Sequence, residues 1–422
     1  MKRHIALLGG TTTLSDTIVT ASKLMLPYNL TDGSYISKYE EIFAKKVGSR
    51  LAISFSTGRV GLYGLLKSFG IGYRDEIILQ VPTHIVVSNA IKYAGATPVY
   101  VDCSLENYNI NLNSVRSKIT SHTKAIILQH TFGIPVDINE AIALAKKHGL
   151  IIIEDCVHAL GATYDGKNIG SFGHASFFST EETKICSTTM GGMVVTDDPI
   201  IANKMKEFQK KCSIPNFWSS YRYLLKYTLY YFLLHPNLHK YTRALYELFG
   251  NRLPLPRPTT YEELIGKIPD KYEQRLSNGQ ALIGLRQLNK LDENLKHRRK
   301  IASIYDNKLR SKGLKVLEIP EKSEPSYVRY PVWVEDRTKA VSCYKPYGVL
   351  GTWFTSVLEE AISPSYGDYV KGSCPNAELA AQHLVNLPTH QKVKISDAEK
   401  LFNVLEDLII DPVKISLKIK DQ

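Results

Sequence analysis

The stretch LIIIEDCVHALGA (150–162) decides the fold of this chain. Four apolar residues precede two carboxylates, Glu154 and Asp155, which is the pattern of a buried strand that ends in polar residues. A carboxylate in that place is unfavourable unless it is paired. Asp155 therefore predicts either a ligand at the end of this strand or the N-cap of a following helix.

Similar strand-like runs surround this stretch, and helical patterns such as residues 138–149 separate them. The runs are EIILQVP (76–82), ATPVYVD (96–102), KAIILQH (124–130) and GGMVVTDD (191–198). This alternation predicts an α/β fold with a mixed, mostly parallel sheet that is covered by helices. Ligands bind at the carboxyl ends of the strands in such sheets, which draws attention to Asp102, His130 and Asp155.

The pattern changes after about residue 200. An aromatic and basic insertion is followed by a long amphipathic helical region, a strand and two further helices, at residues 213–258, 278–311, 327–336, 377–384 and 396–409. We therefore expect a large domain at 25–270 that carries the insertion, and a smaller α+β domain at 271–422.

Composition narrows the class of function. The net charge of +12, from 53 basic and 41 acidic residues, suits an anionic ligand. The sequence has neither zinc-finger spacing nor an aromatic RNA-binding signature, so we expect no nucleic-acid partner. Its six cysteines form no CxxC pair, which predicts no metal site and reduced thiols in a cytoplasmic protein. The apolar run Ile5–Leu8 is too short for a signal peptide.

Lys184 lies in SFFSTEETKICSTTMGGMVVTDD (176–198), between two strand-like runs. A single lysine in a loop is usually solvated. Together with Asp155, however, Lys184 indicates a pyridoxal site, because this cofactor needs a lysine amine and also a carboxylate that keeps its ring nitrogen protonated. Ser179 and the segment SFSTGRVGL (54–62), which contains a helix start, offer phosphate donors, although for the STG motif ordinary helix capping is the commoner explanation.

Several motifs in order are similar to the DegT/DnrJ/EryC1/StrS sugar aminotransferase family, of the pyridoxal-phosphate-dependent fold type I. The resemblance covers about residues 25–410. Its motifs are STGRVGL (56–62), NAIKYAGATPVYVD (89–102), QHTFGIPVD (129–137), HGLIIIEDCVHALGA (148–162), Lys184 before Gly191-Gly192, RLSNGQALIGLRQLNKLDE (275–293) and CPNAELAAQHLVNLPTH (374–390). Each motif is weak alone, whereas the ordered set is specific.

The resemblance implies a role for each matching residue. It implies that Lys184 forms the Schiff base with pyridoxal phosphate, that Asp155 pairs with the ring nitrogen, and that His158 lies near the cofactor hydroxyl and the lysine. The remaining matches are a ring stacked on the pyridine, at His84, and phosphate contacts at Gly58 and Ser179. A structural histidine bonded to backbone remains the alternative for His84.

Three positions depart from the family pattern. Arg59 stands where a threonine is usual, and Glu273 where relatives often have an asparagine that reaches the phosphate from the neighbouring subunit. Arg59 is expected either to bind the phosphate or to pair with Glu273 across a dimer interface. Met190 replaces a common glutamate, without an assigned effect.

The resemblance implies a homodimeric aminotransferase that moves an amino group from an amino acid, glutamate, to a keto-sugar linked to a nucleotide, in surface polysaccharide or amino-sugar biosynthesis. Relatives that dehydrate sugars carry histidine in place of Lys184, so its presence favours transamination. The alternatives are a cyclitol or lipid-like acceptor, and a non-catalytic, membrane-associated regulator of the same fold.

The stretch FWSSYRYLLKYTLYYFLLHP (217–236) leaves two interpretations open. It is too short in apolar residues to span a bilayer, yet it suits a membrane interface, with Arg222, Lys226 and Lys240 toward lipid headgroups. A helical lid or dimer contact near the substrate entrance is the favoured interpretation, because amphipathic aromatic helices usually bury against protein.

Overall fold

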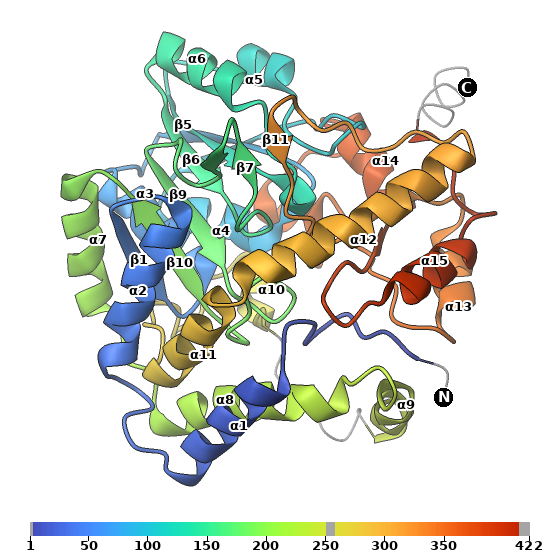
Figure 1. Cartoon of the computed structure of the whole chain (residues 1–422). Helices are drawn as coiled ribbons and strands as arrows, with labels where there is room; N and C mark the ends of the chain where they lie inside the picture. Colours follow the sequence, from blue (N-terminus) through green and yellow to red (C-terminus); the bar gives the residue numbers. More distant parts are fainter. Residues whose placement is uncertain (1–2, 250–257, 413–422) are drawn as a thin grey trace.

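The computed structural model describes residues 3–249 and 258–412 (Figure 1). A seven-stranded sheet in the first half of the chain has the strand order β1-β10-β9-β6-β5-β2-β4. Only β10 is antiparallel to its neighbours, β1 and β9, so the predicted mixed, mostly parallel sheet is confirmed. The strands are β1 (Leu51–Phe55), β2 (Glu76–Gln80), β4 (Thr97–Val101), β5 (Thr123–Gln129), β6 (Ile151–Asp155), β9 (Ala175–Ser179) and β10 (Gly192–Thr196).

Helices cover both faces of this sheet because successive strand residues point to opposite sides. Ile77 and Leu79 pack in one core with α3 and α4, whereas Ile78 between them packs in another with α5 and α6. The helices around the sheet are α2 (Ser34–Val47), α3 (Gly58–Ser68), α4 (Ile85–Tyr93), α5 (Leu112–Lys118), α6 (Ile138–His148) and α7 (Pro199–Lys211). Gly149 ends α6 in the left-handed conformation, with φ of 65°, as its sequence predicts.

The C-terminal part of the chain has its own apolar core, which includes Tyr305, Tyr330, Val385 and Phe402. Ile5 from the N-terminal segment packs in the same core. The elements here are α12 (Leu291–Ser311), α13 (Arg337–Tyr344), α14 (Pro375–His383), α15 (Ile395–Asn403), and the paired strands β12 (Tyr330–Trp333) and β14 (Leu384–Leu387). The division of the chain near residue 270 stays a prediction.

The region 278–311, expected as one helical stretch, consists of two helices. α11 (Asn278–Leu288) packs against α2, and α12 then crosses to the C-terminal core (Figure 1). Lys290 at the junction has φ of −108° and ψ of 4°, outside the helical region. A change of packing partner thus ends a pattern that is continuous in sequence.

The aromatic insertion forms α8 (Phe217–Leu233) and α9 (His239–Phe249), and its residues 250–257 lie outside the described part of the chain. α8 runs beside α1 (Leu14–Met25), joined by a 2.7 Å hydrogen bond between the Thr228 and Thr20 hydroxyls. In residues 3–249 and 258–412, none of the helices is long and apolar enough to cross a membrane.

Candidate active site

Asp155 is the last residue of β6 and is almost fully buried, with 1% of its surface exposed. Its Oδ1 accepts the Val157 N–H at 3.1 Å. Its Oδ2 is buried and has no hydrogen-bond partner within the described residues. Burial raises the pKa of Asp155 to about 7, against the opposing effects of the Val157 N–H and of Lys184. A buried carboxylate oxygen without a partner can accept a hydrogen bond from a cationic N–H group of a ligand.

Lys184 lies in the turn between β9 and β10, where its backbone N–H bonds the Glu181 carbonyl at 3.0 Å. Its Nζ lies over the Trp353 ring, 4.3 Å from the ring centre. Burial lowers the pKa of Lys184 to about 8, with a further contribution from Arg329, while Glu181 and Asp155 act in the opposite direction. A larger fraction of the amine is therefore neutral near pH 7 than in an ordinary lysine, as attack on an aldehyde requires.

His158 is stacked between two aromatic rings, those of Phe132 at 6.1 Å and Trp353 at 4.9 Å between centres. Burial, assisted by the Lys184 and Arg329 charges, holds the pKa of His158 well below its usual range. Its Nδ1 accepts the Phe132 N–H at 3.4 Å, which leaves the proton of the neutral ring on Nε2. His158 thus presents one defined donor.

His84 ends the short strand β3 (Thr83–His84), and its Nδ1 caps α4 by accepting the Val86 N–H at 3.3 Å. Its Nε2 lies 3.3 Å from Oε2 of Glu360. Glu360 directly follows β13 (Leu358–Glu359), which pairs with β3. The ring is therefore fixed from both sides, and its predicted stacking on the cofactor stays a prediction.

The predicted phosphate positions meet at the N-terminus of α3. The Thr57 hydroxyl accepts the Val60 N–H, and Gly58 is the first helical residue. A Cβ on Gly58 would lie 2.9 Å from the Phe178 carbonyl oxygen, so only glycine allows β9 to approach this closely. Ser179, the last residue of β9, follows directly. The first-turn N–H groups of a helix form an anion site, which fits a phosphate here.

Arg59 has a partner that the sequence analysis missed. Its Nε lies 2.5 Å from Oε1 of Glu263, and its Nη2 donates to the Pro258 carbonyl at 2.8 Å. Glu263 belongs to the short helix α10 (Tyr261–Leu264) and is 1% exposed. Glu273 is hydrogen-bonded to Tyr63, and burial together with this carboxylate raises the pKa of Tyr63. Whether Arg59 also reaches a phosphate stays a prediction, as does its pairing with Glu273 across a dimer.

The other two polar strand ends serve the fold. Asp102 accepts the backbone N–H groups of Asn376 and Ala377 and so anchors the start of α14. A carboxylate at a helix N-terminus is favourable because it pairs with unsatisfied N–H groups. This contact joins the sheet to the C-terminal part of the chain.

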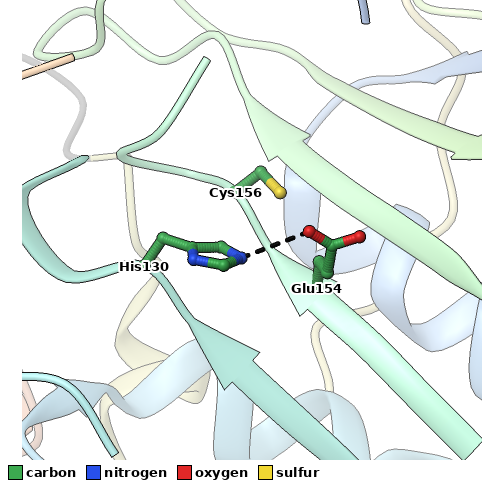
Figure 2. Close-up of side chains that lie close together, drawn as sticks. All are labelled: His130, Glu154 and Cys156. Carbon is green, nitrogen blue, oxygen red and sulfur yellow. Dashed lines mark ion pairs between the residues drawn. The ribbon is translucent and has the colours of Figure 1, made fainter. Parts of the chain in front are cut away.

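His130 points toward Glu154 and lies beside Cys156, as Figure 2 shows, with 3.3 Å between His130 Nε2 and Glu154 Oε2. The His130 Nδ1 accepts the Val136 N–H, so the proton of a neutral ring is on Nε2, facing the carboxylate. Glu154 also accepts three backbone N–H groups of the turn 170–173. These donors occupy both carboxylate oxygens, which identifies the group as an anchor for this turn beside Asp155.

The insertion contacts the turn that carries Lys184. Lys226 Nζ lies 2.6 Å from Oε2 of Glu182, and the Tyr230 hydroxyl donates to the same oxygen at 2.5 Å. Both side chains belong to α8, and Glu182 is two residues before Lys184. One of the lysines expected to face lipid headgroups is therefore paired inside the protein, which supports the lid interpretation.

Sequence reasoning also missed the side chains that the C-terminal part contributes. Trp353 contacts Lys184 and His158, and Arg329 lies against the same indole ring, with Cζ 3.6 Å from its centre. Their only sequence signal is that Arg329 lies in the expected strand 327–336. A buried arginine in a strand is unusual.

The residues present fit pyridoxal phosphate. The amine of Lys184, the unpartnered oxygen of Asp155 and the helix start at Gly58 match the aldehyde, ring nitrogen and phosphate of this cofactor. The Nε2–H of His158 supplies a donor for the hydroxyl group. Each of these groups lies at or shortly after the end of a strand of the large sheet, or at the start of a helix that packs on it.

Comparison with known proteins agrees with this arrangement. The chain is 35% identical to the GDP-perosamine synthase of Escherichia coli O157:H7 over 279 residues, 66% of this chain and 64% of the relative. It is 28% identical to the GDP-perosamine synthase of Caulobacter vibrioides over 383 residues, 90% and 91% of the two chains. The solved E. coli GDP-4-keto-6-deoxy-D-mannose-3-dehydratase with bound hydrated PLP superposes with a TM-score of 0.72 at 22% identity, covering 96% of this chain and all of the other.

The family profile extends over nearly the whole chain, with residues 16–231 and 235–406 matched. It therefore includes Lys184, Asp155 and His158 as well as the C-terminal part that carries Arg329. The chain belongs to the DegT/DnrJ/EryC1/StrS aminotransferase family, and it is an aminotransferase that depends on pyridoxal phosphate.

Proposed function

We propose that this aminotransferase takes its amino group from glutamate and passes it to a keto-sugar carried on a nucleotide. The observation that carries the chemistry is the pairing, in one site, of the Lys184 amine with a lowered pKa and the unpartnered Asp155 oxygen. Bound pyridoxal phosphate supplies an electron sink for the carbon that exchanges its nitrogen. The protein has to hold that group, orient it and move protons.

Lys184 has two tasks in this proposal. Its Nζ would hold the cofactor at the aldehyde, and the same amine, when free, would move a proton to or from the substrate carbon. The pKa of about 8 suits both, because an amine titrating near the working pH accepts and returns protons readily. The unpartnered Asp155 Oδ2 would keep a proton on the ring nitrogen, and the His158 Nε2–H would orient the cofactor hydroxyl.

The acceptor class rests on relatives and on charge. The GDP-perosamine synthases that the chain resembles are named for a nucleotide-linked sugar product. The net charge of +12 favours the approach of a diphosphate-bearing substrate by electrostatic steering. These observations support a role in amino-sugar or surface polysaccharide biosynthesis. A cyclitol or lipid-like carbonyl compound is the alternative acceptor.

We propose further that the active enzyme is a homodimer. The family pattern at Glu273 implies that a residue of a second subunit would complete the phosphate site at the N-terminus of α3. Analytical ultracentrifugation of the enzyme loaded with cofactor is expected to give a dimer. A monomer with full activity would overturn this part of the proposal.

A screen of separate half-reactions tests the substrate assignment. Enzyme loaded with pyridoxamine phosphate is mixed with 3-keto and 4-keto nucleotide sugars, keto-cyclitols and plain 2-keto acids, and the amino product is followed by mass spectrometry. We expect fast product formation with a nucleotide keto-sugar, and its loss in the Asp155→Ala variant. Turnover with 2-keto acids alone would refute the sugar assignment and leave the Lys184 chemistry intact.

A further inference from the structure

Arg329 stands immediately before β12 and is 3% exposed. Its guanidinium lies against the Trp353 ring, which the Lys184 amine also contacts. Within residues 3–249 and 258–412, the guanidinium has neither a hydrogen-bond acceptor nor an ion-pair partner. A buried and unpaired charge is strongly unfavourable, so such a group calls for a ligand.

The carboxylates that face Arg329 are already engaged elsewhere. Glu181 and Glu359 attract it, but neither is within ion-pair distance. Glu181 accepts the Thr183 N–H at 2.9 Å, and Glu359 accepts the N–H and hydroxyl of Thr355. Arg329 is thus buried, and the two neighbouring carboxylates accept hydrogen bonds from other residues.

A second buried arginine adds to the positive charge. Arg298 of α12 is 2% exposed and, within the part of the chain that the structure describes, bonds only neutral acceptors: the carbonyls of Tyr327 and Val328 and the side chains of Asn294 and Thr389. Arg298, Arg329 and Lys184 line one small cavity. Glu182, also at this cavity, is neutralised by Lys226. The cavity wall is therefore cationic and suits an anion.

Proximity to Lys184 identifies the kind of anion. An amino acid carries its carboxylate on the same carbon that bears the transferred nitrogen, whereas the diphosphate of a nucleotide sugar is several bonds from the carbonyl that is aminated. A cation beside the reactive amine therefore meets the carboxylate of the donor. The planar fork of arginine matches a carboxylate with two parallel hydrogen bonds.

We propose that Arg329, supported by Arg298, binds the α-carboxylate of the amino donor and so selects amino acids as donors. This inference rests on the proposed function only in that an amino acid is the donor. It is independent of the acceptor sugar. Arg329 acts as a specificity-determining residue for the first half-reaction, and the second half-reaction, with an acceptor that lacks this carboxylate, does not use it in the same way.

The test compares Arg329→Gln and Arg329→Lys with Arg299→Gln. Arg299 is the control because its guanidinium is bound to the Pro325 and Gly161 carbonyls and paired with Glu324 at the surface. The glutamate half-reaction is measured by stopped flow, and the binding of glutarate, an unreactive dicarboxylate, by calorimetry. Arg329→Gln is expected to raise the KM for glutamate about 100-fold and to weaken glutarate binding by a similar factor.

Arg329→Lys keeps the charge without the fork and is expected to be intermediate, about 10-fold. Half-reaction rates with a keto-sugar are expected to fall much less than those with glutamate, because this acceptor has no α-carboxylate for Arg329 to bind. Unchanged glutamate KM and glutarate affinity in folded Arg329→Lys and Arg329→Gln would overturn the inference. The inference would also be overturned if the Arg329 variants bound inorganic pyrophosphate more weakly than the wild type while their affinity for glutarate was unchanged. If none of the keto-sugars in the screen reacts, that result would count against the proposed function alone, because the glutamate measurement involves no sugar.

Discussion

The amine of Lys184 lies 4.3 Å from the centre of the Trp353 indole ring. Lys184 belongs to a turn of the large sheet, whereas Trp353 belongs to the C-terminal part of the chain. The reactive amine is therefore covered by a side chain that is 169 residues away from it in the sequence. This enclosure is what lowers the pKa of the amine, and it links the chemistry of the lysine to the packing of both parts.

The capture of the cofactor is predicted to depend on pH through Lys184. With a pKa of about 8, about one amine in ten is neutral at pH 7, against about one in three thousand for an ordinary lysine. The rate at which cofactor-free protein binds pyridoxal phosphate should rise with pH and level off above about 8. Stopped-flow absorbance from pH 6 to pH 10 measures it. A rate that still rises tenfold per unit above pH 9 would contradict this value.

Asp155→Asn is predicted to have opposite effects on stability and activity. The folded-state pKa of Asp155 is raised to about 7, above its ordinary 3.8, so the favourable protonated form is present below pH 4 and is lost as pH rises through 7. At pH 8 the variant without cofactor should be more stable than the wild type, with a free energy of unfolding that is higher by on the order of 4 kcal/mol at most. It should therefore unfold at a higher temperature.

Turnover of the same variant should fall by at least about 100-fold, because the amide cannot hold the ring proton by charge. Thermal melts at pH 4 and pH 8 provide the internal control, since the stability difference should vanish at the lower pH. An equal change in stability at both pH values would assign the effect to packing instead of charge.

Arg59→Gln is predicted to destabilise the protein by about 3 kcal/mol, because it leaves the buried Glu263 carboxylate without its partner. Changing Glu263 to Gln in the same chain should restore most of this loss. Chemical denaturation of the single and double variants measures both. A parallel titration with pyridoxal phosphate shows whether Arg59 also binds the phosphate: in that case cofactor affinity stays weak in the double variant.

The α8 contact with Glu182 is predicted to hold the Lys184 turn in place. Lys226→Ala combined with Tyr230→Phe should weaken cofactor binding about 3- to 10-fold, since it removes both donors to Glu182. Arg243→Ala, which breaks an exposed ion pair on α9, is the matched control and should have no effect on cofactor binding.

Liposome flotation of the wild type separates the lid from the membrane interpretation: flotation that is lost when 217–236 is removed would favour the membrane.

The sequence predicts those site residues that local structure positions. Asp155 ends strand β6 and Lys184 follows strand β9, and strands that run in parallel bring their ends to one edge of the sheet. His158 follows Asp155 by three residues, but its role in the site is implied by the family resemblance and not by spacing. The mixed, mostly parallel α/β fold follows from the same alternation of runs, whereas the reversal of β10 is seen only in the structure.

The side chains that sequence reasoning missed depend on packing between distant segments. Arg59 pairs with Glu263 across more than two hundred residues, and Trp353 and Arg329 reach the site from the C-terminal part. Hydrophobic periodicity carries no information on such contacts. The break between α11 and α12 has the same origin. α11 packs against α2 and α8, whereas α12 starts in the same core and continues into the C-terminal core, while the apolar pattern is continuous.

The most direct test of the account is to reduce the enzyme with borohydride in the presence of pyridoxal phosphate and to locate the modified residue by peptide mass spectrometry. We expect one cofactor per chain, attached to Nζ of Lys184, and neither label nor turnover in the Lys184→Ala variant. A label on another lysine, or a wild type that turns over without any label, would contradict the assignment of Lys184 as the residue that holds the cofactor.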